Sequence, residues 1–189
     1  MPLGDAVPPA DVTTGELAVV RPRADEDLPA LVEVLAQVHE RDRYPIMRSN
    51  VRAGWLTEPD GPAWVAERDG VVVGQVALQH GADPVSATAL GVDPAEALTL
   101  SRFFVAPAAR GSGAARALLD TVEAYARGAG RSLALEAVGH SVAARALYAA
   151  RGWTPLGSYE ARWFGDDGPA FDAYRFVLPL QPAEPAVGP

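Results

Sequence analysis

The sequence predicts an α/β (α+β) fold in which a mixed, mostly antiparallel central sheet is flanked by helices. Short apolar runs bounded by turn residues are typical of strands, and longer segments with apolar residues at helical spacing lie between them. Hairpins are expected near the start and at the end of this order. In the middle, a helix-like segment separates two strand-like runs, which is how parallel strands are joined. This order places helices on both faces of the sheet.

The first half of the chain is expected to hold three strands around one long helix. Acidic residues 25–27 precede an apolar stripe that begins at Leu28, which suits the positive end of a helix dipole. Asp69 and Gly70 separate two strand-like runs and readily supply the positive φ angles of a hairpin turn. The expected elements are a strand at 17–21, a helix from 28 that fades near 39–43, a short helix or loop within 46–60, strands at 63–67 and 71–78, and a loop at 81–95.

The second half alternates strands with amphipathic helices. The run 132–138 is almost continuously apolar, as expected for a strand that is covered on both faces. Ser141 can cap the helix that follows, and Gly152 can end it. The expected elements are a strand at 97–105, a helix with the stripe Ala115, Leu118, Leu119, Val122 and Tyr125, a strand at 132–138, a helix with Ala144, Leu147 and Tyr148, and strands at 153–162 and 173–180.

The composition fits one acidic domain. With 189 residues the chain can bury a sizeable core. A net charge of -8 argues against nucleic acid as a partner and favours a cationic or amine-bearing substrate. The sequence has no cysteine, which excludes disulfides, thiolate zinc sites and cysteine nucleophiles. We expect a disordered leader at 1–15, one domain at 16–180 and a flexible tail at 181–189.

Targeting segments are not recognisable in the sequence. The N-terminus lacks a basic region followed by an apolar run. No apolar stretch reaches the roughly 18 residues that a membrane span needs. We therefore expect a cytoplasmic protein without a membrane partner, either a monomer or a homodimer.

The segment 100–115 is the most informative part of the sequence. A strand runs into a loop that opens directly into a helix, whose first backbone N–H groups have no intrahelical acceptor. Gly111 and Gly113 lack a Cβ, so an anion can approach these N–H groups closely. Arg110 can add a charged donor, and the small Ala114 and Ala115 leave the approach open. The segment therefore predicts a phosphate or pyrophosphate site.

Three kinds of phosphate binder compete for this segment. A nucleoside triphosphate loop needs a Gly-Lys pair, which the sequence does not contain. A dinucleotide fold needs a third glycine where Arg116 stands, although Glu136 lies at a suitable distance for a ribose-binding acid. The dinucleotide interpretation, and with it an oxidoreductase, stays open as the less favoured alternative.

Two motifs resemble those of the GCN5-related N-acetyltransferase (GNAT) family. Val105, Pro107, Arg110, Gly113 and Ala115 match a strand followed by V-x-P and R-x-x-G-x-A. Residues 141–153 resemble the family's N-x-x-A-x-x-L-Y-x-x-x-G-F motif, with Ser141 where asparagine is usual. The resemblance extends over about residues 17–180 and implies the acyl-CoA N-acyltransferase (GNAT) fold.

The resemblance implies an N-acetyltransferase that moves an acetyl group from acetyl-CoA, its co-substrate, directly to a primary amine of a small molecule or peptide, without a metal. Strand 97–105 would separate from strand 132–138 and admit the pantetheine arm. Tyr148 would be the catalytic general acid for the departing thiolate. A non-catalytic acyl-CoA sensor is the alternative. The expected cofactor-binding residues are Phe103, Phe104, Val105, Arg110, Gly111, Ser112, Gly113, Ala114, Ala115 and Ser141.

The sequence leaves the general base and the acceptor open. His80, Glu96 and Glu136 are the base candidates. His39, Glu40 and Asp42 are interpreted as a solvated helix end rather than a metal cluster. By the resemblance, residues 39–55 with Tyr44, and residues 159–171, would select the acceptor. The second region carries Trp163, Phe164, Asp166 and Asp167, which would suit a cationic amine or, equally, anchor the loop with buried aromatic rings.

Overall fold

The computed structural model describes residues 18–180, so the expected leader and tail lie outside the described part. Within these residues, seven strands form one sheet in the order β1-β2-β3-β4-β5-β7-β6. Among the six strand pairs of this described part, β4 and β5 are parallel and the other five are antiparallel. The predicted mixed, mostly antiparallel sheet is confirmed. Within residues 18–180, no helix is long and apolar enough to span a membrane.

Apart from a helix at residues 84–90, the elements follow the predicted order along the chain. The strands are β1 (Val19–Pro22), β2 (Ala63–Arg68), β3 (Val71–His80), β4 (Leu98–Val105), β5 (Leu133–Val138), β6 (Thr154–Ala161) and β7 (Phe171–Leu178). The α-helices are α1 (Leu28–Asp42), α2 (Ala53–Thr57), α3 (Pro84–Leu90), α4 (Ala114–Gly128) and α5 (Val142–Ala150), joined by short 3-10 turns.

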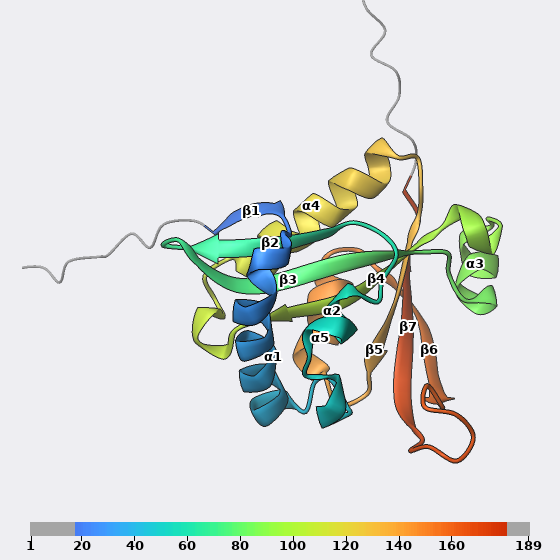
Figure 1. Cartoon of the computed structure of the whole chain (residues 1–189). Helices are drawn as coiled ribbons and strands as arrows, with labels where there is room; N and C mark the ends of the chain where they lie inside the picture. The colour runs from blue at the N-terminus through green and yellow to red at the C-terminus, as the bar shows by residue number, and fades with distance from the viewer. Residues whose placement is uncertain (1–17, 181–189) are drawn as a thin grey trace, which may run out of the picture.

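The helices cover the sheet from both sides. Figure 1 shows α1 and α2 in front of the sheet and α4 and α5 behind it. Leu31 and Leu35 of α1 are fully buried, as are Leu118 and Val122 of α4. The apolar stripes read from the sequence are therefore the faces that these helices turn toward the sheet.

The expected loop at 81–95 was wrong, because it contains helix α3 and a 3-10 turn at Pro94–Glu96. The Asp83 carboxylate caps α3 by accepting hydrogen bonds from the N–H groups of Val85 and Ser86. Gly91 ends the helix with a φ of 69°. These start and stop signals are visible in the sequence, but the helix is only seven residues long and shows little periodicity.

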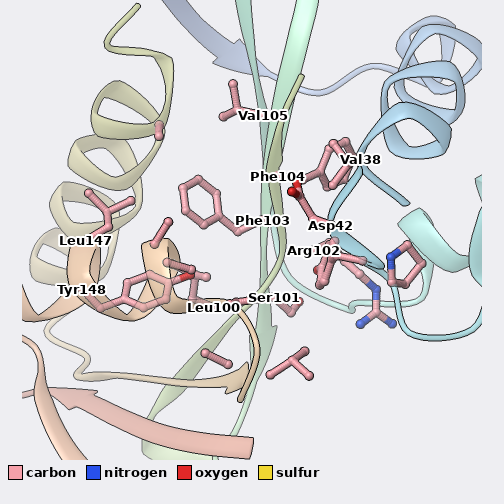
Figure 2. A pocket seen from close by; sticks show the side chains of 18 of the residues that line it. Val38, Asp42, Leu100, Ser101, Arg102, Phe103, Phe104, Val105, Leu147 and Tyr148 are labelled. Carbon is pink, nitrogen blue, oxygen red and sulfur yellow. The ribbon is translucent and has the colours of Figure 1, made fainter. Parts of the chain in front are cut away.

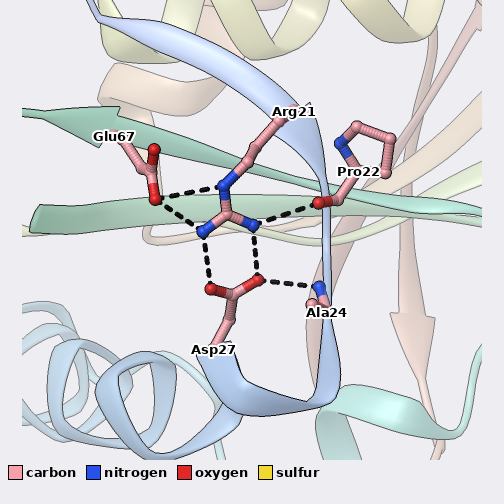
Figure 3. Close-up of polar contacts among 5 residues, drawn as sticks. All are labelled: Arg21, Pro22, Ala24, Asp27 and Glu67. Carbon is pink, nitrogen blue, oxygen red and sulfur yellow. Dashed lines mark hydrogen bonds and ion pairs between the residues drawn. The ribbon is translucent and has the colours of Figure 1, made fainter. Parts of the chain in front are cut away.

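An ion cluster fixes the start of α1 against the sheet (Figure 3). The Arg21 guanidinium donates two bonds to the Asp27 carboxylate, at 2.7 and 2.8 Å, and also contacts Glu67 of β2. The Asp27 carboxylate in turn accepts from the N–H of Ala24 at 2.7 Å. Hydrogen bonds from Arg21 lower the pKa of Asp27, and those to Asp27 and Glu67 raise the pKa of Arg21. The acidic run before α1 therefore serves this cluster as well as the helix dipole.

Candidate active site

Strands β4 and β5 run together for three residues and then separate. Their ladder begins at Leu98 opposite Leu133 and ends at Leu100 opposite Leu135. Beyond that point, residues 101–105 and 136–138 carry no ladder pair on the edges that face each other. Their backbone N–H and C=O groups on these edges are therefore available to an extended ligand.

A bulge in β4 accompanies this separation. Phe104 of β4 pairs with Gln75 of β3, and Ser101 pairs with Ala77. One residue lies between the two pairs on β3, whereas two residues lie between them on β4. The extra residue is Arg102, whose φ of 51° lies in the left-handed region. Figure 2 shows Ser101 and Arg102 on one side of β4, with Asp42, and Leu100 and Phe103 on the other side, with Tyr148.

A cleft of about 1330 Å³ passes through this gap and reaches both sides of β4. It is lined by the predicted general acid and by every residue that the sequence predicted for cofactor binding. These residues are Phe103, Phe104, Val105, Arg110, Gly111, Ser112, Gly113, Ala114, Ala115, Ser141 and Tyr148. The structure thus brings together residues that are 45 positions apart in the chain.

The loop before α4 forms a cradle of unpaired backbone donors. Gly111 and Gly113 have φ angles of 80° and 89°, and a Cβ built on either would meet nothing within 4 Å. Among residues 18–180, the N–H groups of Gly111, Gly113, Ala114, Ala115 and Arg116 find no acceptor. Because the dipole of the 15-residue helix α4 adds positive potential here, the cradle fits a pyrophosphate.

Arg110 is engaged on the side of the cleft that faces α1. Its guanidinium forms an ion pair with the Asp42 carboxylate, with Nη1 3.3 Å from Oδ1. The backbone oxygen of Asp42 also lies 3.0 Å from Nε2 of His140. Asp42 thereby connects the end of α1 to the cradle and to the segment before α5. Ser112 turns its hydroxyl away, donating to the carbonyl of Ala109 at 2.6 Å.

Tyr148 lies in an aromatic pocket on the α5 side of the sheet. Its ring centroid is 6.3 Å from that of Phe103 and 5.7 Å from those of Trp153 and Phe176. Burial raises the pKa of its hydroxyl, which therefore keeps its proton at neutral pH. Ser141 occupies the N-cap position of α5 but makes no side-chain cap bond, so the expected capping role was wrong.

Of the three candidate bases, only Glu136 lines the cleft. Glu96 accepts from the N–H of Asp93 in a capping box, and His80 lines a smaller hollow that borders the cleft. The Tyr159 hydroxyl donates a hydrogen bond to the Glu136 carboxylate, and Arg175 Nε lies 3.4 Å from Glu136 Oε1. Burial, followed by the bond to Glu136, raises the pKa of Tyr159.

The sheet register separates Glu136 from Tyr148. Leu135 pairs with Phe176, whose ring packs on Tyr148 behind the sheet. Because consecutive strand residues point to opposite faces, Glu136 faces the front. The cleft therefore presents a buried phenol on one face and a carboxylate on the other.

The interpretation of His39 as part of a solvated helix end was wrong. His39 is buried, with Nδ1 2.7 Å from the carbonyl oxygen of Pro45, whereas the neighbouring Glu40 and Arg41 are exposed. Residues 18–180 hold no group of three or more side chains arranged to bind a metal. Trp163 and Phe164, for which burial was one of two interpretations, are 43% and 36% exposed and line the cleft.

The sequence did not single out Arg102 and Glu58 as members of this cleft. Glu58 follows α2, whereas Arg102 stands in β4, 44 positions later. Their side chains meet at the bulge of β4, where the Arg102 guanidinium donates to the Glu58 carboxylate at 2.9 Å. Trp55 and Tyr44, which lay in the predicted acceptor region, also line the cleft. Burial raises the pKa of Tyr44 to about 12.

Comparisons with known proteins extend this description. A sequence profile of the "Acetyltransferase (GNAT) family" matches residues 28–153. The ribosomal-protein-S18-alanine N-acetyltransferase from Escherichia coli is 20% identical, with a TM-score of 0.66 over 91% of this chain and 99% of its own. The ribosomal-protein-alanine N-acetyltransferase from Brucella melitensis is 25% identical, with a TM-score of 0.65 over 86% and 99%. The Salmonella typhimurium protein yncA, solved with its cofactor acetyl-CoA, is 19% identical, with a TM-score of 0.64 over 92% and 100%. No curated protein matches the sequence.

Proposed function

The chain belongs to the acetyltransferase (GNAT) family, and from that premise we propose that it acetylates a primary amine of a small molecule or peptide in the cleft between β4 and β5. Acetyl-CoA is the donor that this family uses. The observation that supports the site is the cradle of unpaired N–H groups at the start of α4, next to the unpaired edges of β4 and β5. We assign the N-acetyltransferase domain to residues 16–180.

Coenzyme A fits the donors that the cleft offers. The unpaired N–H groups of Gly111 and of residues 113–116 would hold the pyrophosphate, with Arg110 beside them. Backbone groups of Phe103 to Val105 would bond to the pantetheine amides in place of the missing β5 partner. Ser141, whose side chain makes no cap bond, lines the cleft and would contact the pantetheine arm. Holding the remote parts of the donor fixes the position of the thioester, which is catalysis by proximity.

Glu136 and Tyr148 would divide the proton transfers. An amine is protonated at neutral pH, and Glu136 would accept one of its protons on the front face of the sheet. The amine nitrogen then bonds to the acetyl carbon as the carbon–sulfur bond breaks. Tyr148 would donate its proton to the sulfur from the α5 side, and the second nitrogen proton replaces it. Tyr159 and Arg175 orient the Glu136 carboxylate.

The test is release of free thiol from acetyl-CoA with a panel of amines. The panel includes peptides that begin with alanine, because two similar structures are named ribosomal-protein-alanine N-acetyltransferases. We expect turnover with at least one amine. Tight binding of coenzyme A without turnover of any amine would contradict the enzyme and favour the sensor. Thermal shift with NAD, which should not bind, checks the oxidoreductase alternative.

The proposal includes a cellular location and an oligomeric state. We expect a cytoplasmic protein that acts on its amine without nucleic acid or membrane, as a monomer or homodimer. Size-exclusion chromatography with light scattering distinguishes the two oligomeric states.

A further inference from the structure

The bulge in β4 sets two hydrogen-bond donors next to each other on the acceptor side of the cleft. Ser101 and Arg102 are consecutive, yet both side chains lie on the front of the strand (Figure 2) and both line the cleft. Regular pleating would have sent them to opposite faces. Arg102 adopts a φ of 51°, which costs free energy for a residue other than glycine. Such strain is concentrated at sites that bind or react.

The Arg102 guanidinium is held rigidly and has one edge unused. Its Nε donates to the carbonyl of Trp55 at 3.0 Å, and its Nη2 donates to Glu58 at 2.9 Å. Its central carbon lies 4.0 Å from the centroid of the Trp55 ring. Within residues 18–180, Nη1 donates to no acceptor. The guanidinium is therefore oriented before any ligand arrives, which lowers the entropic cost of binding.

Ser101 supplies the second unused donor. Its hydroxyl oxygen is buried, and no group of residues 18–180 hydrogen-bonds to it. A buried hydroxyl without a partner is unfavourable unless a ligand or water satisfies it. Ser101 also follows the last ladder pair, Leu100 with Leu135, so it stands across the gap from Glu136.

We propose that Ser101 and Arg102 bind the carboxylate of the acceptor, so that the acceptor is a free amino acid rather than a peptide N-terminus. A carboxylate accepts two bonds at once, which suits a hydroxyl beside a guanidinium edge. Glu136 on the facing strand binds the ammonium group. Each charged group of an amino acid therefore lies next to a group of the opposite charge in the cleft. This inference rests on the proposed function, because it names the acceptor class of the same site.

The side chain of the amino acid is apolar and large. Trp163 and Phe164 line the same cleft with much of their surfaces exposed, and both rings pack on Phe171. Exposed aromatic rings at a cleft gain stability when an apolar group covers them. An aromatic or branched apolar amino acid would pair its charged groups with Arg102 and Glu136 and cover these rings with its side chain.

The experiment compares acceptors that differ only in the carboxylate. L-phenylalanine, L-phenylalaninamide and phenethylamine form one set, and L-leucine, L-leucinamide and isopentylamine form a second. We expect kcat/KM to be highest for the acid in at least one set, by about tenfold or more over its amide. Arg102→Gln and Ser101→Ala should lower kcat/KM for the acid, by about 10- to 100-fold and about 3- to 10-fold respectively, and change it for the amide by less than about threefold.

Controls separate a lost contact from a disturbed fold. Arg52→Gln removes another arginine that pairs with Glu58, at 2.8 Å, but does not line the cleft, so the preference for the acid should remain. Ser101→Ala removes a hydroxyl without partners, so its melting temperature should match that of the wild type.

The outcomes distinguish this inference from the proposed function. Amides or simple amines as the best acceptors in both sets, or an acid preference that neither variant reduces, would overturn the carboxylate site while leaving the acetyltransferase intact. Alanine-initiated peptides as the best acceptors would overturn it as well. No thiol release with any amine, although coenzyme A binds, would overturn both.

Discussion

Removing the Asp42 carboxylate should strengthen the binding of coenzyme A. Asp42 pairs with Arg110, whose side chain lines the cleft beside the unpaired N–H cradle. A pyrophosphate in that cradle would compete with Asp42 for the same guanidinium. The free protein therefore keeps one of its donors occupied, and binding of coenzyme A has to break or share that ion pair.

The magnitude follows from the exposure of the pair. The side chains of Arg110 and Asp42 are 42% and 32% exposed, so solvent screens their attraction. Exposed pairs contribute about 0 to 1 kcal/mol, and this two-contact geometry belongs at the upper end. Since about 1.4 kcal/mol corresponds to a factor of ten, Asp42→Asn should lower the Kd of coenzyme A by about three- to fivefold.

Isothermal titration with coenzyme A measures this effect. Glu40→Gln is the matched control, because it removes the same charge from a carboxylate of α1 that pairs weakly with Arg48 and does not line the cleft. In an Arg110→Gln background, the substitution of Asp42 should change the Kd by less than about twofold. Equal strengthening by Glu40→Gln, or a Kd that Asp42→Asn leaves unchanged, would refute the competition.

Three further predictions concern the acid, the cradle and the ion cluster. Tyr148→Phe should lower kcat by about 100-fold or more. The melting temperature should not change, because the Tyr148 hydroxyl has no hydrogen-bond partner to lose among residues 18–180. A pH–rate profile of the wild type that gave Tyr148 a pKa below 10 would contradict the effect of its burial. Gly113→Val should weaken coenzyme A binding about tenfold or more. The control Gly91→Val also places a side chain at a positive φ, but outside the cleft, so it should destabilise the fold without weakening coenzyme A binding. Asp27→Asn should lower the free energy of unfolding by about 1 to 3 kcal/mol at neutral pH. Because the folded pKa of Asp27 lies below its ordinary value, this contribution is present above about pH 4 and is lost as the pH falls through the folded pKa, so urea unfolding should show the variant and the wild type converging in acid.

Features that depend on neighbouring residues were predicted well from the sequence. The path from β4 through Gly111 and Gly113 into α4 is one continuous segment, so its glycines and helix start could be recognised without knowing the rest of the fold. Helix α3 could also have been recognised, since Asp83 and Gly91 are a cap and a stop at helical distance. Its seven residues were too few for a periodic pattern to outweigh the turn residues around them.

Features that depend on register were not predictable. From the sequence, His80, Glu96 and Glu136 are equally suitable candidates for the general base, because each lies in or beside a predicted strand. Only the pairing of β5 with β4 and β7 places Glu136 in the gap and on the face opposite Tyr148. Likewise, nothing local distinguishes Arg102 from other arginines, because its role follows from one extra residue in β4 relative to β3.

The bulge at Arg102 links the two halves of the proposed site. An extra residue in β4 changes which side chains face front and back beyond Leu100, at the point where the ladder to β5 ends. Phe103 consequently faces back toward Tyr148, where the thioester would lie, while Ser101 and Arg102 both face front toward the acceptor. A strand without the bulge would place Arg102 on the donor side and leave the front with one donor fewer. Deleting one residue of β4 should therefore impair donor and acceptor binding together, although the two sites lie on opposite faces of the sheet.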